Sequence, residues 1–167
     1  DLELVETPSY FMDVVDQNHG GWDIGYLQTN GVGMDYTYKP QEQSDANPYM
    51  FEMTIANVGA SPLHGIRMNV EVFNSGGVTQ FTSTSDTTTL AVLDTAFYLA
   101  NQTFAPTSQG VYDMNFWASS DSISSSDTST MTAVITDSVY GRDNNVPGGN
   151  WRVGRLCGGL QLANKFD

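Results

Sequence analysis

The sequence predicts an all-β chain, an immunoglobulin-like Greek-key β-sandwich of about seven or more antiparallel strands. Two stretches, 51–56 and 66–73, alternate apolar with polar residues, and the connection between them contains glycine and proline. A third stretch, 111–118, alternates in the same way. A period of two puts every second side chain on the same face, so each stretch predicts a strand with one buried and one solvated face.

The elements expected before this centre are shorter. Residues 2–6 predict a short edge strand. Residues 12–33 are rich in turn residues and contain one candidate strand at 22–27. Residues 36–40 predict another strand that proline ends, and 41–48 predict a polar loop, because proline and polar residues interrupt strand pairing.

Further strands are expected after the centre. Residues 78–89 are rich in threonine, whose β-branching favours an exposed strand. Residues 90–100 predict a strand, and 131–139 predict the last strand of the sandwich. Residues 119–129 are almost wholly Ser, Asp and Thr, which predicts a flexible or highly solvated loop.

The alternation also predicts which side chains form the core. The inward set comprises Phe51, Met53, Ile55, Met68, Val70, Val72, Tyr112, Met114 and Phe116.

Composition narrows the function classes. The 167 residues fit one domain, or one domain with part of another, and 40% hydrophobic residues are too many for a disordered chain. A net charge of −13 argues against nucleic acid and anionic membranes as partners, because both need clustered Lys and Arg. No apolar run is long enough to span a membrane, and no signal peptide remains, so we expect a processed or excised chain.

The charge changes sign near the C-terminus, which predicts a boundary. Residues 1–137 are assigned to the sandwich, and 138–167 form a glycine-rich basic tail. From Arg142 onward there are four basic and two acidic residues. The tail is either a junction with the first strand of a following domain or a strand that completes this one. Because it also carries Trp151 and several aliphatic residues, we predict that it packs on the sandwich or on a neighbouring copy.

The order of these signals resembles a CARDB-type adhesion domain, an Ig-like family of secreted and surface proteins. The resemblance covers about residues 1–137 and rests on Asp1–Leu4, Phe51–Gly59 and Gly110–Phe116. Tyr112 in the last of these resembles the tyrosine corner of Greek-key sandwiches, which implies a hydrogen bond from its hydroxyl to backbone in the preceding loop. The tail is similar to junctions between modules in large secreted Bacteroidota proteins, many of them exported by the type IX system.

That resemblance implies O-glycosylation, which in those bacteria occurs at Asp-Ser/Thr followed by a small apolar residue or Thr. The matching hydroxyl residues are Thr87, Thr95, Ser122 and Ser138. The alternative interpretation is that they are ordinary exposed strand and loop residues.

The sequence predicts no enzyme. His19 and His64 are the only histidines, and both adjoin glycine, so we expect each in a surface or turn position. The single Cys157 is expected to be a small core residue. No zinc ligand spacing occurs. Calcium is the one metal considered, at the oxygen-bearing run Asp143, Asn144 and Asn145 or at Asp121 and Asp127, because Ca²⁺ takes six to eight oxygen ligands.

Two functions remain open. The first is a non-catalytic structural or adhesive module of a large secreted or cell-surface bacterial protein, with neighbouring domains or copies of the same protein as partners. The second is a carbohydrate-binding accessory domain of a secreted enzyme, recognising glycans through exposed aromatic residues. Trp117 falls on the polar phase of its strand, and Trp22 and Tyr26 would extend an aromatic platform. Cell-surface glycans are therefore the alternative partner.

Overall fold

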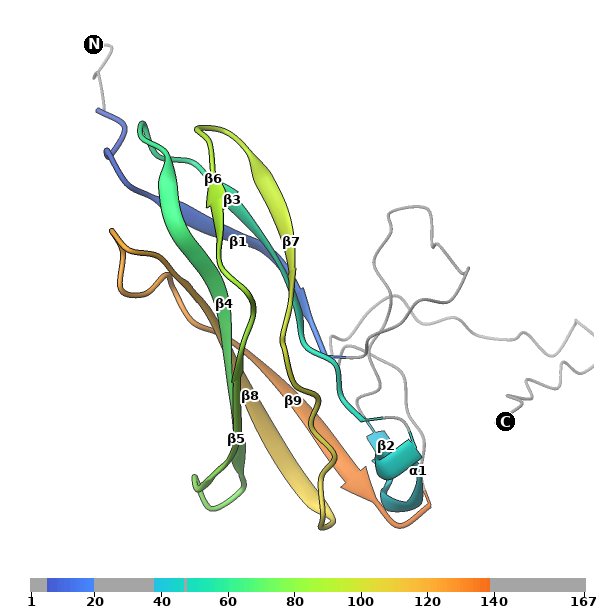
Figure 1. The fold of residues 1–167 in the computed structure, drawn as a ribbon. Helices are drawn as coiled ribbons and strands as arrows, with labels where there is room; N and C mark the ends of the chain where they lie inside the picture. The colour runs from blue at the N-terminus through green and yellow to red at the C-terminus, as the bar shows by residue number, and fades with distance from the viewer. Residues whose placement is uncertain (1–5, 20–37, 47, 139–167) are drawn as a thin grey trace, which may run out of the picture.

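A computed structural model describes residues 6–19, 38–46 and 48–138, and these form two facing β-sheets (Figure 1). The first sheet has the order β1-β3-β7, formed by Met12–Asn18, Glu52–Asn57 and Thr95–Leu99. The second has the order β2-β9-β8-β4-β5, formed by Tyr38–Pro40, Ser129–Thr136, Gly110–Ser119, Leu63–Asn74 and Thr79–Thr84. A short strand β6, Thr88–Leu90, pairs with the first part of β4.

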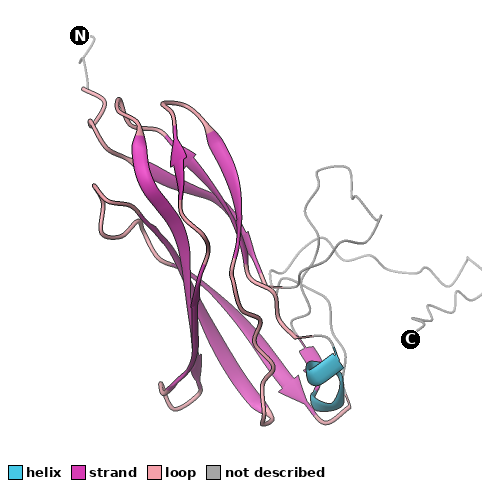
Figure 2. Cartoon of the chain, viewed as in Figure 1, coloured by secondary structure: helices cyan, strands magenta, loops and turns pink. Residues whose placement is uncertain are grey.

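The chain crosses between the sheets in Greek-key fashion. It leaves the first sheet after β3, builds β4, β5 and β6 in the second, returns for β7 and crosses again for β8 and β9. All named strand pairs are antiparallel except β2 with β9, which run parallel. Apart from one short helix, the described chain is strands and their connections (Figure 2). The prediction of an all-β, immunoglobulin-like sandwich is confirmed.

The core lies between the two sheets and follows the predicted alternation. All nine side chains expected to face inward are buried. Aromatic rings join the sheets, since Phe51 of β3 stacks on Phe81 and meets Phe116 of β8 edge to face. Offset and edge-to-face rings of this kind stabilise a core beyond the area that they bury.

The tyrosine corner is also as expected. The Tyr112 hydroxyl donates to the Ser108 carbonyl at 2.9 Å and lies 2.9 Å from the Ser108 hydroxyl. This contact fixes the loop before β8 against the start of that strand.

One predicted element is wrong, one strand was not predicted, and the candidate strand at 22–27 lies outside the described residues. Residues 41–46 form a helix, α1 (Gln41–Ala46), where a polar loop was expected. Pro40 directly precedes it, and proline suits a helix start because the first N–H groups need no intrahelical partner. The segment before the centre also holds a full strand, β1, which pairs along β3 with a bulge between Val14 and Asp16. The bulge interrupts the alternation on which sequence analysis relies.

The edge of the sandwich where β3 ends is held by one side chain, Asn57. It is fully buried, and its Nδ2 donates to the carbonyls of Ser61 at 3.0 Å, Leu90 at 3.2 Å and Ala91 at 3.0 Å. Its Oδ1 accepts from the Gly59 N–H at 3.0 Å. A single amide therefore ties the β3–β4 turn to the β6–β7 turn.

Candidate functional site

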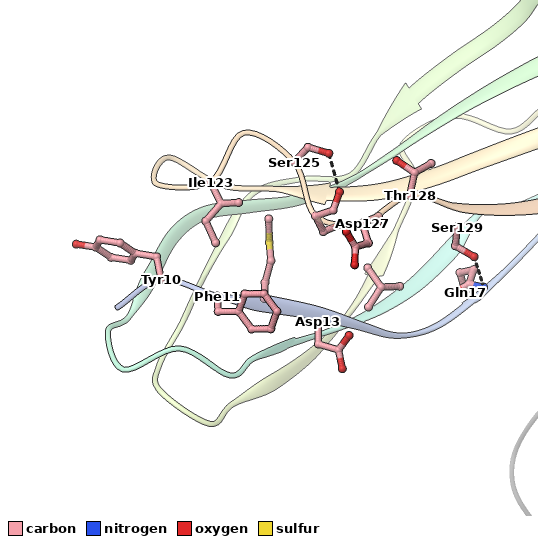
Figure 3. Close-up of a pocket in the computed structure, with 12 residues that line it drawn as sticks. Tyr10, Phe11, Asp13, Gln17, Ile123, Ser125, Asp127, Thr128 and Ser129 are labelled. Atoms are coloured by element: carbon pink, nitrogen blue, oxygen red, sulfur yellow. Dashed lines mark hydrogen bonds between the residues drawn. The ribbon is translucent and has the colours of Figure 1, made fainter. Parts of the chain in front are cut away.

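A groove of about 410 Å³ lies along the open side of the sandwich, where the edge strand of one sheet faces the β8–β9 loop of the other. We call it the seam groove. Its first wall is β1 with the residues just before it, and its second wall is the loop up to the start of β9 (Figure 3). The lining residues are Tyr10, Phe11, Met12, Asp13, Val14, Gln17, Ile123, Ser125, Ser126, Asp127, Thr128 and Ser129.

The strand side of the groove presents aromatic rings near the N-terminal end of β1. Tyr10 is 48% and Phe11 52% exposed, whereas Met12 belongs to the buried core. Val14 is half-buried and packs on that core. Large exposed aromatic side chains beside apolar surface are typical of contact sites.

The loop side is polar and well held. Ser120 Oγ accepts from the N–H groups of Ser122 at 3.3 Å and Ile123 at 3.0 Å. Ser126 donates its N–H to the Ala118 carbonyl at 2.8 Å, and its Oγ accepts from the Ala118 N–H at 2.8 Å. The serine-rich loop is therefore largely exposed, as predicted, and is shaped by hydrogen bonds from its own serine side chains.

The charge of the groove is negative. Asp13 lies on the strand wall and Asp127 on the loop wall (Figure 3), and both are exposed. None of the described residues that line the groove is basic. At the β9 end, Gln17 Nε2 donates to Ser129 Oγ at 2.8 Å and joins the two walls. The arrangement suits a ligand with apolar parts and positive charge.

A second polar cluster is buried where β1 ends. His19 is only 1% exposed and meets the Tyr49 ring edge to face at a centroid distance of 5.1 Å. The Lys39 Nζ lies 4.6 Å from the centre of the same ring. Burial lowers the pKa of His19 from 6.5 to about 4, helped by the nearby Lys39 charge, and burial lowers the pKa of Lys39 from 10.5 to about 8.

The predicted surface position of His19 is therefore wrong. The residue follows β1 directly, and the sheet carries it into contact with a ring from another segment, which no local pattern in the sequence indicates. His64 is exposed, in agreement with its predicted surface position, and its Nδ1 lies 3.2 Å from the Thr89 hydroxyl.

Of the three aromatic residues expected for sugar binding, the structure describes Trp117. Trp117 is half-buried in β8, opposite Asn69 of β4, and does not line the seam groove. Its neighbours along the strand, Asn115 and Asp113, accept hydrogen bonds from threonines of β9 at 2.8 Å. Trp22 and Tyr26 lie outside the described residues.

Some of the other predicted sites lie within the described residues and the rest lie outside them. Among the hydroxyl residues proposed for glycosylation, Thr87, Thr95, Ser122 and Ser138 are all exposed, so attachment to them stays a prediction. The calcium candidates Asp143, Asn144 and Asn145, the single Cys157 and the tail after Ser138 lie outside the described residues. Within the described ranges no three His, Cys, Asp or Glu residues group closely enough to hold a metal ion. The same ranges contain no helix that could span a membrane.

Sequence analysis missed the seam groove. Its aromatic residues stand just before β1, in a segment with no alternating pattern, and its second wall is more than a hundred residues later in the chain. The one available signal was the adjacent pair Tyr10 and Phe11 followed by Asp13.

No family model matches this sequence, and no curated protein matches it. Among solved structures, the chain is similar to the CARDB domain of a Pyrococcus furiosus protein, solved in complex with di-metal ions, with 10% identity, a TM-score of 0.48 and coverage of 80% of this chain and 95% of that one. It is also similar to the C-terminal domain of wzt, with 11% identity, a TM-score of 0.48 and coverage of 90% and 99%.

A family 123 glycoside hydrolase from Clostridium perfringens is similar over 55% of this chain and 22% of the enzyme, with 10% identity and a TM-score of 0.41. A CARDB domain is thus among the similar structures. The fold assignment itself rests on the strand order and register of this chain.

Proposed function

We propose that the chain is a non-catalytic, immunoglobulin-like structural module of a larger secreted or cell-surface protein, and that it packs against a neighbouring domain or copy. The supporting observation is an apolar row on the outer face of the three-stranded sheet. Phe97 is 61% and Leu99 44% exposed, both on the edge strand β7. Val15, at the bulge of β1 in the same sheet, is 58% exposed.

This row is unusual for a free surface. Phe97 pairs with Thr54 and Leu99 with Glu52 on β3. Apolar side chains therefore occupy solvent-facing positions of a strand that also forms a sheet edge. Sheet edges with large exposed apolar residues invite pairing or packing unless something covers them. An exposed apolar face of this kind suits a folded partner, which is the role of a spacer or assembly unit.

Hydroxyl-radical footprinting tests the proposal on the parent protein, displayed on intact cells or purified from the medium, against the isolated chain. Phe97 and Leu99 should be oxidised in the isolated chain and protected in the parent protein. Val78, which is 59% exposed in the β4–β5 turn, serves as the control and should react equally in both. Equal oxidation of Phe97 in the two preparations would contradict an assembly role for this face.

Export would be supported by the glycosylation motifs. Thr87, Thr95, Ser122 and Ser138 are exposed, which is what attachment of O-linked sugar requires. The intact mass of protein from its native source should then exceed the mass of the bare polypeptide. A native mass equal to the polypeptide would remove this support for a type IX-exported glycoprotein.

The carbohydrate-binding alternative rests on Trp117, a half-buried indole beside the polar side chains of Asn69 and Asn115. Such a ring can stack on the apolar face of a sugar while its neighbours bond to hydroxyls. Titration with a panel of soluble neutral oligosaccharides should change the tryptophan fluorescence of the protein and not of Trp117→Phe. Absence of any response to the panel would leave the structural role as the better proposal.

A further inference from the structure

We propose that the seam groove binds the chain's own basic tail, with residues 150–156 as the segment that enters it. This inference does not depend on the assembly role proposed for the outer face of the β1-β3-β7 sheet. It rests on the shape of the groove, its charge and the reach of the tail.

The groove lies along an edge where the sandwich is incompletely closed. β1 pairs with β3 on one side, and within the described residues its other side has no strand partner. Ile123 packs on the core from the opposite wall but leaves about 410 Å³ open between them. An extended segment laid against a free strand edge can hydrogen-bond to its backbone and fill such a gap with side chains. A concave slot beside a free strand edge therefore favours an extended segment.

The charges of groove and tail are complementary. The groove carries Asp13 and Asp127, and none of its described lining residues is basic. Before Arg142 the whole sequence has only two basic residues, Lys39 and Arg67. Lys39 is buried, and Arg67 bonds to Ser119 on the second sheet, so neither neutralises the groove. The tail supplies the remaining four.

The residue types of segment 150–156 complement those that line the groove. It reads Asn-Trp-Arg-Val-Gly-Arg-Leu, so two arginines lie within a few residues of a Trp, a Val and a Leu. A guanidinium stacks on aromatic rings and pairs with carboxylates, and Tyr10 and Phe11 offer such rings beside Asp13. Burial of Trp151, Val153 and Leu156 between the two walls would drive binding, and the arginines would set the orientation.

The tail can reach the groove within one molecule. Ser129, at the start of β9, lines the near end of the groove, and Ser138 lies nine residues further along the chain, about 30 Å away at ~3.3 Å per residue. Trp151 follows Ser138 by thirteen residues, which extend to about 43–47 Å, so the segment from Trp151 onward reaches the groove from its Ser129 end. The same segment of a second copy would satisfy the same contacts, so the test must separate the two cases.

Amide NMR shifts of the full chain give the first test. We compare the wild type with a variant that carries Trp151→Ala, Arg152→Gln and Arg155→Gln, and with the control Lys165→Gln, which changes charge in the tail outside the proposed segment. The triple change should shift the amides of 10–13 and 123–128, and the control should not. Shifts confined to the tail, or centred on β7, would overturn the proposal.

Disulfide trapping gives the second test and uses Cys157, the only cysteine of the chain. Ser125→Cys places a thiol in the groove, and Thr82→Cys places one at an exposed position on β5 as the matched control. A disulfide requires the two Cα atoms to lie within about 7 Å. Mild oxidation should link Cys157 to position 125 and not to position 82. A cross-linked monomer indicates binding within one chain, and a cross-linked dimer indicates exchange between copies. Equal yields at the two positions, or none at 125, would contradict the assignment.

Discussion

Replacing Asn57 by alanine should weaken the sandwich more than any other exchange of a polar residue in its turns. The side chain is fully buried and has four hydrogen-bond contacts that join two separate turns. Its amide has two hydrogens for three carbonyls, so the contacts amount to about three full bonds at ~1 kcal/mol each. We expect Asn57→Ala to lower the free energy of unfolding by about 3 kcal/mol.

That loss is a large share of the ~5–15 kcal/mol that stabilises a typical domain. At ~2–4 °C per kcal/mol for a chain of this size, the melting temperature should fall by about 6–12 °C. Asn57→Asp should be at least as harmful, because a carboxylate keeps the acceptor for the Gly59 N–H but faces the three carbonyls with no donor.

Urea unfolding followed by tryptophan fluorescence measures the effect. The matched control is Asn115→Ala, whose side chain accepts one exposed hydrogen bond from Thr130 on the sheet surface. We expect that control to change stability by less than ~0.5 kcal/mol. If Asn57→Ala lay within the range of the control, the amide would not be the clamp between the two turns.

Three further predictions follow from single side chains. Burial lowers the pKa of His19 from 6.5 to about 4. As pH falls below 6.5, His19 therefore takes up a proton in the unfolded chain before it does so in the folded chain, which favours unfolding. The stability that is present above pH 6.5 should decrease progressively until about pH 4. Urea midpoints across this range should fall less steeply for His19→Phe, and identical slopes would refute the buried position. A methyl group at Gly59 would lie 2.6 Å from the backbone nitrogen of Phe11, so Gly59→Ala should lower the stability measured by thermal unfolding by about 1–3 kcal/mol. The control Gly76→Ala should be near neutral, because a methyl group there meets only a side-chain oxygen at 3.3 Å. Tyr112→Phe removes the corner hydrogen bond and should cost about 1 kcal/mol by the same measurement, and an unchanged melting temperature would show that the corner adds no stability.

The strands at the centre of this chain could be predicted because their information is local. A strand directs alternate side chains to opposite faces, and one of these faces packs on the core. Phe51 and Val70 are therefore buried. The tyrosine corner could also be anticipated, since Tyr112 and the loop that it contacts are only four residues apart.

The features that matter for binding depend on contacts between distant segments. The seam groove exists because β1 of one sheet and the β8–β9 loop of the other, far apart in sequence, face each other across it. His19 is buried because Tyr49 is placed against it, although its own neighbours resemble a turn. Phe97 and Phe51 are the same residue type, and only the pairing register shows that Phe97 faces solvent. The sequence by itself therefore determined the class of fold and the part of its core that the three central strands carry, through periodicity within single strands. The tertiary structure decided which apolar and charged groups share a surface, because that depends on how the two sheets are laid together.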